Sequence, residues 1–212
     1  MDRSMGLERM MMFRRDIMKK IKNYHPEGGL DTATIVMLSL MSFNHAPIRV
    51  HTENVALMAE AVALRMKKDA RAAFFAGLMH DAGKMILPSC LLDGRNITDA
   101  EYAEVKKEAI ITYQVRKKTH LFVAYCAGFH HALYEKGQGL TSQDFPSVWQ
   151  PQIVEEILEI ATIVAICDYV EDFSNNDELG ISLEESLKMA FPNELKIVQV
   201  VLEEAGRMHY EY

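Results

Sequence analysis

The apolar residues of this chain recur every three to four positions in almost every segment, which is the spacing of one face of an α-helix. Between residues 49 and 67, for example, Val55, Met58 and Val62 follow this spacing. No run of alternating apolar and polar residues is long enough for a β-sheet, and the chain contains no internal repeat. We therefore expect an all-α protein that folds as one helical bundle.

Residues that favour helix ends divide this pattern into segments. Asp31 and Asp69 are predicted N-caps, and Pro151 suits the first turn of a long helix. Thr98 with Glu101 and Ser182 with Glu185 have the spacing of capping boxes. The predicted helices cover residues 30–44, 49–67, 70–81, 98–118, 119–134 and 153–173, a last helix starts at 192–193, and 137–150 form the clearest loop.

The composition is that of an ordinary globular protein, with 49% hydrophobic and 25% charged residues. The formal net charge of -7 argues against non-specific binding to nucleic acid, although a local basic pocket for a small phosphate ester remains compatible with it. The longest apolar stretch, Ile160–Cys167, is far shorter than a membrane span, so we expect a cytoplasmic protein with no membrane partner. The expected organisation is N-terminal helices over 1–44, a core over 45–175 and C-terminal helices over 176–212, together forming one globular domain.

The three cysteines, Cys90, Cys126 and Cys167, lie far apart in apolar runs and are predicted to be buried free thiols. No pair has the C-x-x-C spacing, which argues against a structural zinc site.

Several histidines and acidic residues interrupt apolar helices, where an unpartnered polar group is costly. His80 and Asp81 end the apolar segment 72–79, and Asp168 follows the apolar residues 163–167. A hydrogen-bonded structural pair explains the first two equally well, and an N-cap or a salt bridge is the alternative for Asp168. A metal ion would satisfy all of them, together with His51, His130 and His131, and a mixed imidazole and carboxylate set suits Fe, Mn, Zn or similar ions.

The order of these residues resembles a known family. His51, then His80-Asp81-Ala82-Gly83-Lys84, then His130-His131 and then Asp168 are similar to the motif of the HD-domain metal-dependent phosphohydrolases, and the resemblance covers about residues 45–175. Within that superfamily, His130-His131 followed by Gly137-Gln138-Gly139 is closest to the HD-GYP branch, whose members hydrolyse cyclic dinucleotides.

The chain departs from the HD-GYP pattern at three places. Leu140-Thr141 replaces the Tyr-Pro of the motif. Ala161-Thr162 lies where an arginine is usual, and Pro47 replaces the glutamate of members that hold a third metal.

The resemblance implies two divalent metal ions, with Mn or Fe favoured and Mg, Zn or Ni also compatible. A hydroxide shared by the ions would attack the phosphorus of a phosphomonoester or phosphodiester, and the resemblance implies a nucleotide-related substrate. Asp81 would bridge the ions, and Lys84 would bind a phosphate oxygen. Lys84 as a cation that only stabilises its helix end is the alternative. The implied ligands are His51, His80, Asp81 and Asp168 for one ion, and Asp81, Glu108, His130 and His131 for the other.

Glu108 stands where the family has a histidine. Its spacing from Ile111 and Val115 places it on their inward face, which favours a ligand over a solvated member of the run Lys106-Lys107-Glu108. His120 is the alternative ligand, whereas His25, His45 and His209 lack any comparable context.

Two other functions remain open at this point. A di-iron oxygenase of the same fold would use a similar ligand set, but Lys84 and the adjacent histidines favour a hydrolase. A non-catalytic signalling or interaction module is the other alternative, and the retention of nearly all ligand types argues against it.

Overall fold

The computed structural model describes residues 3–25, 28–92, 95–134, 138–174 and 181–210. Its elements over these ranges are all helices, with no strand, so the predicted all-α fold is confirmed. None of the helices in the described ranges is long and apolar enough to cross a membrane.

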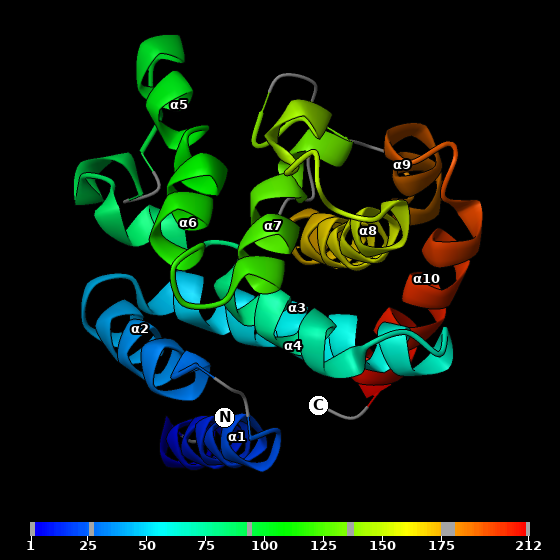
Figure 1. Ribbon diagram of the computed structural model, residues 1–212. Coiled ribbons are helices and arrows are strands. Elements are labelled where there is room, and N and C mark those ends of the chain that lie inside the picture. The colour runs from blue at the N-terminus through cyan, green and yellow to red at the C-terminus, as the bar shows by residue number, and fades with distance from the viewer. Residues whose placement is uncertain (1–2, 26–27, 93–94, 135–137, 175–180, 211–212) are drawn as a thin grey trace.

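Ten α-helices and four short 3₁₀ helices follow one another in the described parts of the chain (Figure 1). The α-helices are α1 Arg3–Asn23, α2 Leu30–Asn44, α3 Ala46–Arg65, α4 Ala70–Met79, α5 Asp99–Val105, α6 Glu108–Arg116, α7 Leu121–Phe129, α8 Pro151–Ser174, α9 Leu183–Ala190 and α10 Leu195–Tyr210. The 3₁₀ helices are η1 Ala82–Ile86, η2 Ser89–Leu91, η3 His131–Leu133 and η4 Ser142–Asp144.

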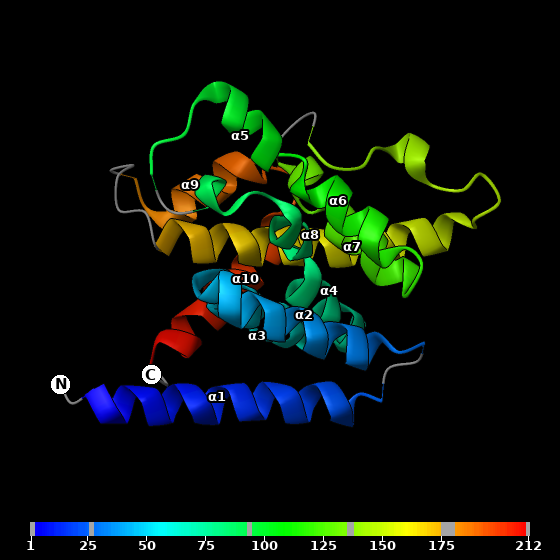
Figure 2. The ribbon, with the colours of Figure 1, turned by 90° about the vertical axis from the view of Figure 1, so that its left-hand side faces the viewer.

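The centre of the bundle is formed by α3, α4, α7 and α8, where α4 and α8 contact each other and both contact α3 and α7. The middle of α8, from Ile160 to Cys167, is buried on every side and apolar except for Thr162, and such a helix is stable only when it is surrounded by other helices. Figure 2 shows α1 as an outer layer below α2, α3 and α4, with α8 above them and α5 at the opposite edge. Helix α6 packs between α7 and η1.

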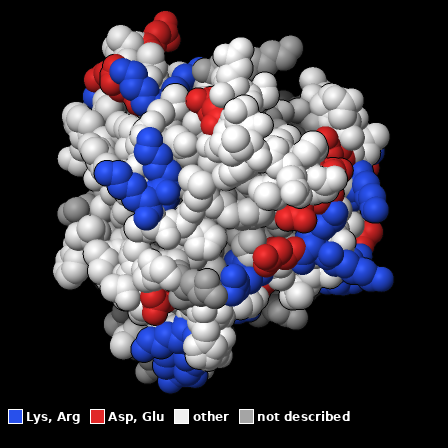
Figure 3. Space-filling model, viewed as in Figure 1, with Lys and Arg blue, Asp and Glu red and all other residues white. Residues whose placement is uncertain are grey.

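Helix α1 covers one face of the bundle through its apolar side. Ile17 and Ile21 are buried in a small core shared with α2 and α4, while Arg15 and Lys19 are exposed. Basic side chains gather over the α1 end of the molecule in Figure 3, a second basic cluster lies at the upper left of that face, and acidic and basic groups are interspersed along its right-hand side. The segment is therefore amphipathic, as its sequence indicates.

Most helix ends predicted from the sequence are present. Asp69 accepts a hydrogen bond from the Ala72 amide, and both predicted capping boxes are formed. The N-cap predicted at Asp31 is wrong, because Gly29 occupies that position with φ 74°. Only glycine adopts this left-handed conformation without strain, so the helix starts directly after it and Asp31 falls in the first turn.

Three other boundaries differ from the prediction because tertiary packing decides them. The predicted helix 98–118 is two helices, since α5 buries no residue whereas α6 turns to pack against α7 and η1. The predicted helix 119–134 ends as an α-helix at Phe129, and the last helix begins at Leu195. Cys126 and Cys167 are buried as expected, but Cys90 is exposed because η2 buries none of its residues.

Gly83 permits the close approach of η1 to α6. A Cβ atom at this position would lie 2.1 Å from the backbone oxygen of Glu108 and 2.9 Å from Thr112 Oγ1. The Gly83 amide donates to Thr112 Oγ1 over 2.7 Å, and that hydroxyl donates to the His80 carbonyl. The glycine after His80-Asp81 therefore fixes α6, and with it Glu108, against the end of α4.

We expect Gly83→Ala to lower the free energy of unfolding by about 1–3 kcal/mol, because the added methyl group meets backbone that cannot move aside without separating η1 from α6. Gly206→Ala is the matched control, since a Cβ there meets nothing within 4 Å. It should be neutral or slightly stabilising, as alanine is the better helix former. Urea unfolding curves of both variants test this, and equal stability of Gly83→Ala and wild type would contradict it.

Candidate metal centre

Three side chains from three helices converge at one point. His51 comes from the first half of α3, His80 follows the last residue of α4, and Asp168 lies on α8. The Nε2 atoms of the two histidines are 3.2 Å apart, and they lie 3.0 and 3.3 Å from Asp168 Oδ1. Contacts of α3 with α4 and of both with α8 create this arrangement, so the core packing sets the geometry of the cluster.

A second group of three lies on the other side of His80. His130 directly follows α7, His131 begins η3, and Glu108 is the first residue of α6. Glu108 Oε1 is 3.0 Å from His131 Nε2 and 3.5 Å from His130 Nε2. The His80 and His130 rings are 5.1 Å apart between centroids, so the two groups are neighbours.

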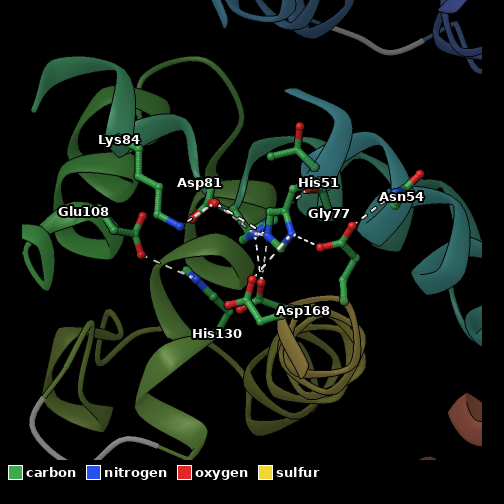
Figure 4. A network of polar contacts seen from close by, with 12 residues as sticks. His51, Asn54, Gly77, Asp81, Lys84, Glu108, His130 and Asp168 are labelled. Atoms are coloured by element: carbon green, nitrogen blue, oxygen red, sulfur yellow. Dashed lines mark hydrogen bonds and ion pairs between the residues drawn. The ribbon is translucent and has the colours of Figure 1, made fainter. Parts of the chain in front are cut away.

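Asp81 lies between the two groups (Figure 4). Its Oδ2 atom is 3.6 Å from the Nε2 atoms of both His51 and His80, and it accepts a hydrogen bond of 2.6 Å from Lys84 Nζ. Asp81 also shares a potential metal-binding cluster with His80 and His130. Asp81 therefore lies where one carboxylate could bind a metal ion in each of the two groups.

The two fully buried imidazoles are oriented by carbonyl groups of their own helices. His80 Nδ1 lies 2.7 Å from the Gly77 oxygen, and His130 Nδ1 makes the equivalent contact with the Ala127 oxygen. A carbonyl oxygen only accepts, so each Nδ1 must carry a proton. The last carbonyls of a helix lack partners within it, which is why residues directly after α4 and α7 can use them.

The more exposed imidazoles are oriented by side chains. His51 Nδ1 contacts Glu171 Oε2 over 2.6 Å, and His131 Nδ1 contacts the Tyr134 hydroxyl over 2.7 Å. In all four histidines Nδ1 is thus occupied and Nε2 faces the centre. This is the arrangement of histidines that bind metal through Nε2 while an outer partner fixes the ring.

The buried acceptor atoms at this centre fit a bound cation. With its proton on Nδ1, neutral His130 has a lone pair on Nε2, and that lone pair faces Glu108. Among the described residues, His130 Nε2, Glu108 Oε2 and Asp81 Oδ1 are buried without a hydrogen-bond partner, and Glu108 Oε1 contacts the ring nitrogens of His130 and His131. Acceptors that face one another out of contact with water are costly unless a cation lies between them.

The protonation equilibria show the same crowding of charge. Burial, strengthened by the neighbouring histidines, lowers the pKa of His130 far below its ordinary value. Burial also raises the pKa of Glu108, although the contact with His131 opposes it. Burial alone would lower the pKa of His51, but the hydrogen bonds to Asp168 and Glu171 outweigh it and raise the pKa to about 11. Burial would likewise lower the pKa of His131, but its contact with Glu108 outweighs that and raises it. Without metal, protons therefore favour positive charge on His51 and His131, whereas His130 stays neutral.

Glu108 is buried as the sequence predicts, but the face that it shares differs from the expected one. Ala109 and Thr112 are buried beside it, whereas Val115, named in the prediction, is 38% exposed. The alternative ligand His120 is the N-cap of α7, where its Nδ1 accepts from the Val123 amide, and it belongs to none of the metal-binding clusters found among the described residues.

Two residues that contact the predicted ligands, Tyr134 and Glu171, and a third that holds Glu171, Asn54, were not predicted from the sequence. Tyr134 reaches both His131 and Asp168, with its hydroxyl 3.4 Å from Asp168 Oδ2. Glu171 contacts His51, and Asn54 donates to Glu171. The only sequence signal for them is spacing, since each lies three residues after a predicted ligand and therefore on the same helical face or turn.

Gly139 and Leu140 close the loop after His131 onto α7. Gly139 has φ 75° and approaches the Gly128 carbonyl so closely that a Cβ would lie 2.4 Å from it. The Leu140 amide donates to that carbonyl, and its side chain is buried over Gly128. Thr141 starts η4 with a capping box, whereas Gly137 lies outside the described residues.

A cavity of about 490 Å³ opens beside the centre. One side of it is apolar and the other carries charged groups. Its lining consists of Pro47, Ile48, Val50, His51, Asp81, Lys84, Glu171 and Asp172.

We expect Glu108→Gln to stabilise the metal-free protein by about 1 kcal/mol at pH 8 while removing metal from the second group. Because the folded pKa of Glu108 is raised, the carboxyl destabilises the fold only above its unfolded pKa, so the gain should shrink at pH 5. Urea unfolding at both pH values and elemental analysis test this. A variant that keeps full metal content without any change in stability would show that Glu108 is not a ligand.

Comparisons with known proteins agree with this architecture. The HD domain family model matches residues 48–172. The HD domain of the L. monocytogenes phosphodiesterase PgpH is similar in structure, with a TM-score of 0.57 and 17% identity over 83% of this chain and 99% of that one. For the same domain in complex with cyclic-di-AMP, the TM-score is 0.58 and the sequence identity is 16%. That comparison covers 83% of this chain and 97% of that one. No curated protein matches the chain in sequence. Because the family match spans more than half of the chain, this protein belongs to the HD-domain family.

Proposed function

We propose that this protein is a metal-dependent phosphohydrolase that acts on a small, nucleotide-related phosphate ester. The observation that carries the proposal is the buried His130 Nε2 lone pair, which has no hydrogen-bond partner and faces the Glu108 carboxylate. With Nδ1 donating to the Ala127 carbonyl and Glu108 ionised, no proton lies between these two acceptors, and a divalent cation there would make the contact favourable.

The donor atoms suit two cations. His51, His80, Asp81 and Asp168 would hold one, and Asp81, Glu108, His130 and His131 would hold the other. Nitrogen and carboxylate donors without thiolates favour Mn or Fe, and the carboxylate of Glu108, where the family has a histidine, strengthens that preference. Ions bound there would neutralise charge on phosphate oxygens and lower the pKa of a water molecule toward neutrality, which is the chemistry that ester hydrolysis needs.

Lys84 is the residue of the chain best placed to receive a phosphate. It belongs to η1, lines the cavity and reaches Asp81. Burial alone would lower its pKa, but the nearby carboxylates, Asp81 first among them, outweigh that and raise it, so the ammonium stays charged at neutral pH. Its role would be to hold a non-bridging phosphate oxygen at the entrance.

The size of the cavity and the similar structures support a nucleotide-related substrate. The volume of about 490 Å³ falls within the range of small-molecule sites. Pro47, Ile48 and Val50 form an apolar wall beside the charged groups, on which a base or another flat group can lie while the phosphate contacts Lys84. A structure of the PgpH HD domain holds cyclic-di-AMP, a molecule of this class.

The first test is the metal content of protein purified without chelators and then loaded with Mn²⁺. Wild type should hold two ions, Asp81→Ala should lose both because the Asp81 carboxylate would be a ligand of each ion, and Asp168→Ala should retain one. Equal losses in the two variants would contradict the bridging position of Asp81. Wild type that remains metal-free after loading would contradict the proposed centre.

The loaded protein should then hydrolyse at least one member of a panel containing nucleoside monophosphates, cyclic dinucleotides, linear dinucleotides and simple phosphomonoesters. Release of phosphate or of a cleaved ester is measured by chromatography. Metal-loaded protein that cleaves none of them, or that instead consumes oxygen with a small alcohol or phosphonate, would contradict the proposed reaction.

Lys84→Ala should lower turnover about 10²-fold and leave the metal content unchanged, as is typical when a charge that contacts the transition state is removed. Lys107→Ala is the matched control, because Lys107 pairs with Glu104 on the exposed surface. Full activity of Lys84→Ala would show that Lys84 only stabilises the Asp81 carboxylate and does not bind the substrate.

A further inference from the structure

His51 lies between two carboxylates of α8. Asp168 Oδ1 is 3.0 Å from its Nε2 atom, and Glu171 Oε2 is 2.6 Å from its Nδ1 atom. The two acidic residues are three positions apart, so both project from the same face of α8 toward α3. The ring is thus held on both edges, with the metal-facing nitrogen on the side of Asp168.

Glu171 is itself held in place from α3. Asn54 Nδ2 donates to Glu171 Oε1 over 3.1 Å, while the other carboxylate oxygen contacts His51. Asn54 lies three residues after His51, and Figure 4 shows the two side chains on neighbouring turns of one helix with dashed lines that lead to the same carboxylate. Both oxygens of Glu171 are therefore used, which fixes its orientation.

The position of His51 explains why a side chain is needed here. His80 and His130 follow helix ends and use carbonyls that the helix leaves free. His51 lies inside α3, where the preceding carbonyls accept hydrogen bonds from amides one turn later. Its Nδ1 atom has no such free carbonyl in its own helix, so an acceptor must come from the neighbouring helix.

We propose that Glu171, fixed by Asn54, is a positioning residue that keeps the Nδ1 proton on His51 and directs Nε2 to the first metal ion. The inference rests on the proposed metal centre and adds to it two residues outside the ligand set. A carboxylate that accepts from Nδ1 orients the ring and makes the other nitrogen a better donor. Two other roles are open to Glu171: a direct ligand of a further ion with His51 and Asp172, or a polar link between α3 and α8.

The test compares Mn²⁺ binding by calorimetry in four proteins. Glu171→Ala should bind the ion of the first group about 10–100-fold more weakly, with the number of ions at saturation unchanged. Glu171→Gln should lose less, because its amide can still accept from His51 and pair with Asn54. Glu156→Gln is the matched control, since Glu156 is an exposed carboxylate of the same helix, and it should bind as wild type does.

A second measurement separates positioning from a structural link. In ¹⁵N spectra of the Zn²⁺-loaded proteins, His51 should show a coordinated Nε2 and a protonated Nδ1 in wild type. In Glu171→Ala the ring should show a mixture of both coordination modes, with metal-free unfolding close to that of wild type.

Unchanged Mn²⁺ affinity in Glu171→Ala would overturn the inference, and so would the loss of a whole ion at saturation, which would make Glu171 a ligand. If the Mn²⁺ affinity of Glu171→Ala falls only because its metal-free fold is less stable, Glu171 acts as a polar link between α3 and α8. Wild type that binds neither Mn²⁺ nor Zn²⁺ would contradict the proposed function and this inference together, whereas the preceding outcomes contradict the inference alone.

Discussion

The central constraint on this fold is that it buries hydrogen-bond acceptors against one another, and their repulsion must be compensated. His130 Nε2 and the Glu108 carboxylate face each other out of contact with solvent, and Asp81 adds another oxygen that lacks a hydrogen-bond partner. Packing of α6, α7 and α4 holds these atoms in place, so the bundle cannot relieve the repulsion by moving one side chain. A cation bound at this point would turn a destabilising feature into the link between the helices. At this centre, the arrangement that binds metal should therefore lower the free energy of unfolding of the metal-free protein.

The fold supplies the rigidity that such a centre requires. The buried middle of α8 fixes Asp168, and the missing side chain of Gly83 lets η1 approach α6 so that Glu108 lies beside the histidines. Backbone carbonyls at two helix ends orient His80 and His130, which makes these rings nearly independent of side-chain changes elsewhere. By contrast, His51 and His131 rely on side chains, Glu171 and Tyr134, and are the positions where substitution can adjust the centre.

The sequence could predict the all-α fold because helical spacing is a local pattern, and it could predict which residues converge because their order resembles a known motif. Helical spacing shows where Asp168 becomes buried, and the order of motif residues points to His51 and His80. The sequence could not predict that Glu171 contacts His51 or that Asn54 holds Glu171, since both contacts depend on how α3 and α8 are rotated against each other. The wrong N-cap at Asp31 and the exposed Cys90 have a similar cause, because a glycine turn and an unburied 3₁₀ helix override the local preference.

The central claim is tested most directly by a crystal structure of the Mn²⁺-loaded protein with anomalous diffraction data collected at the manganese edge. The account predicts two anomalous peaks, one among His51, His80 and Asp168 and one among Glu108, His130 and His131, with Asp81 touching both. Peaks elsewhere, or none at all while His130 still faces Glu108 in the same arrangement, would contradict it.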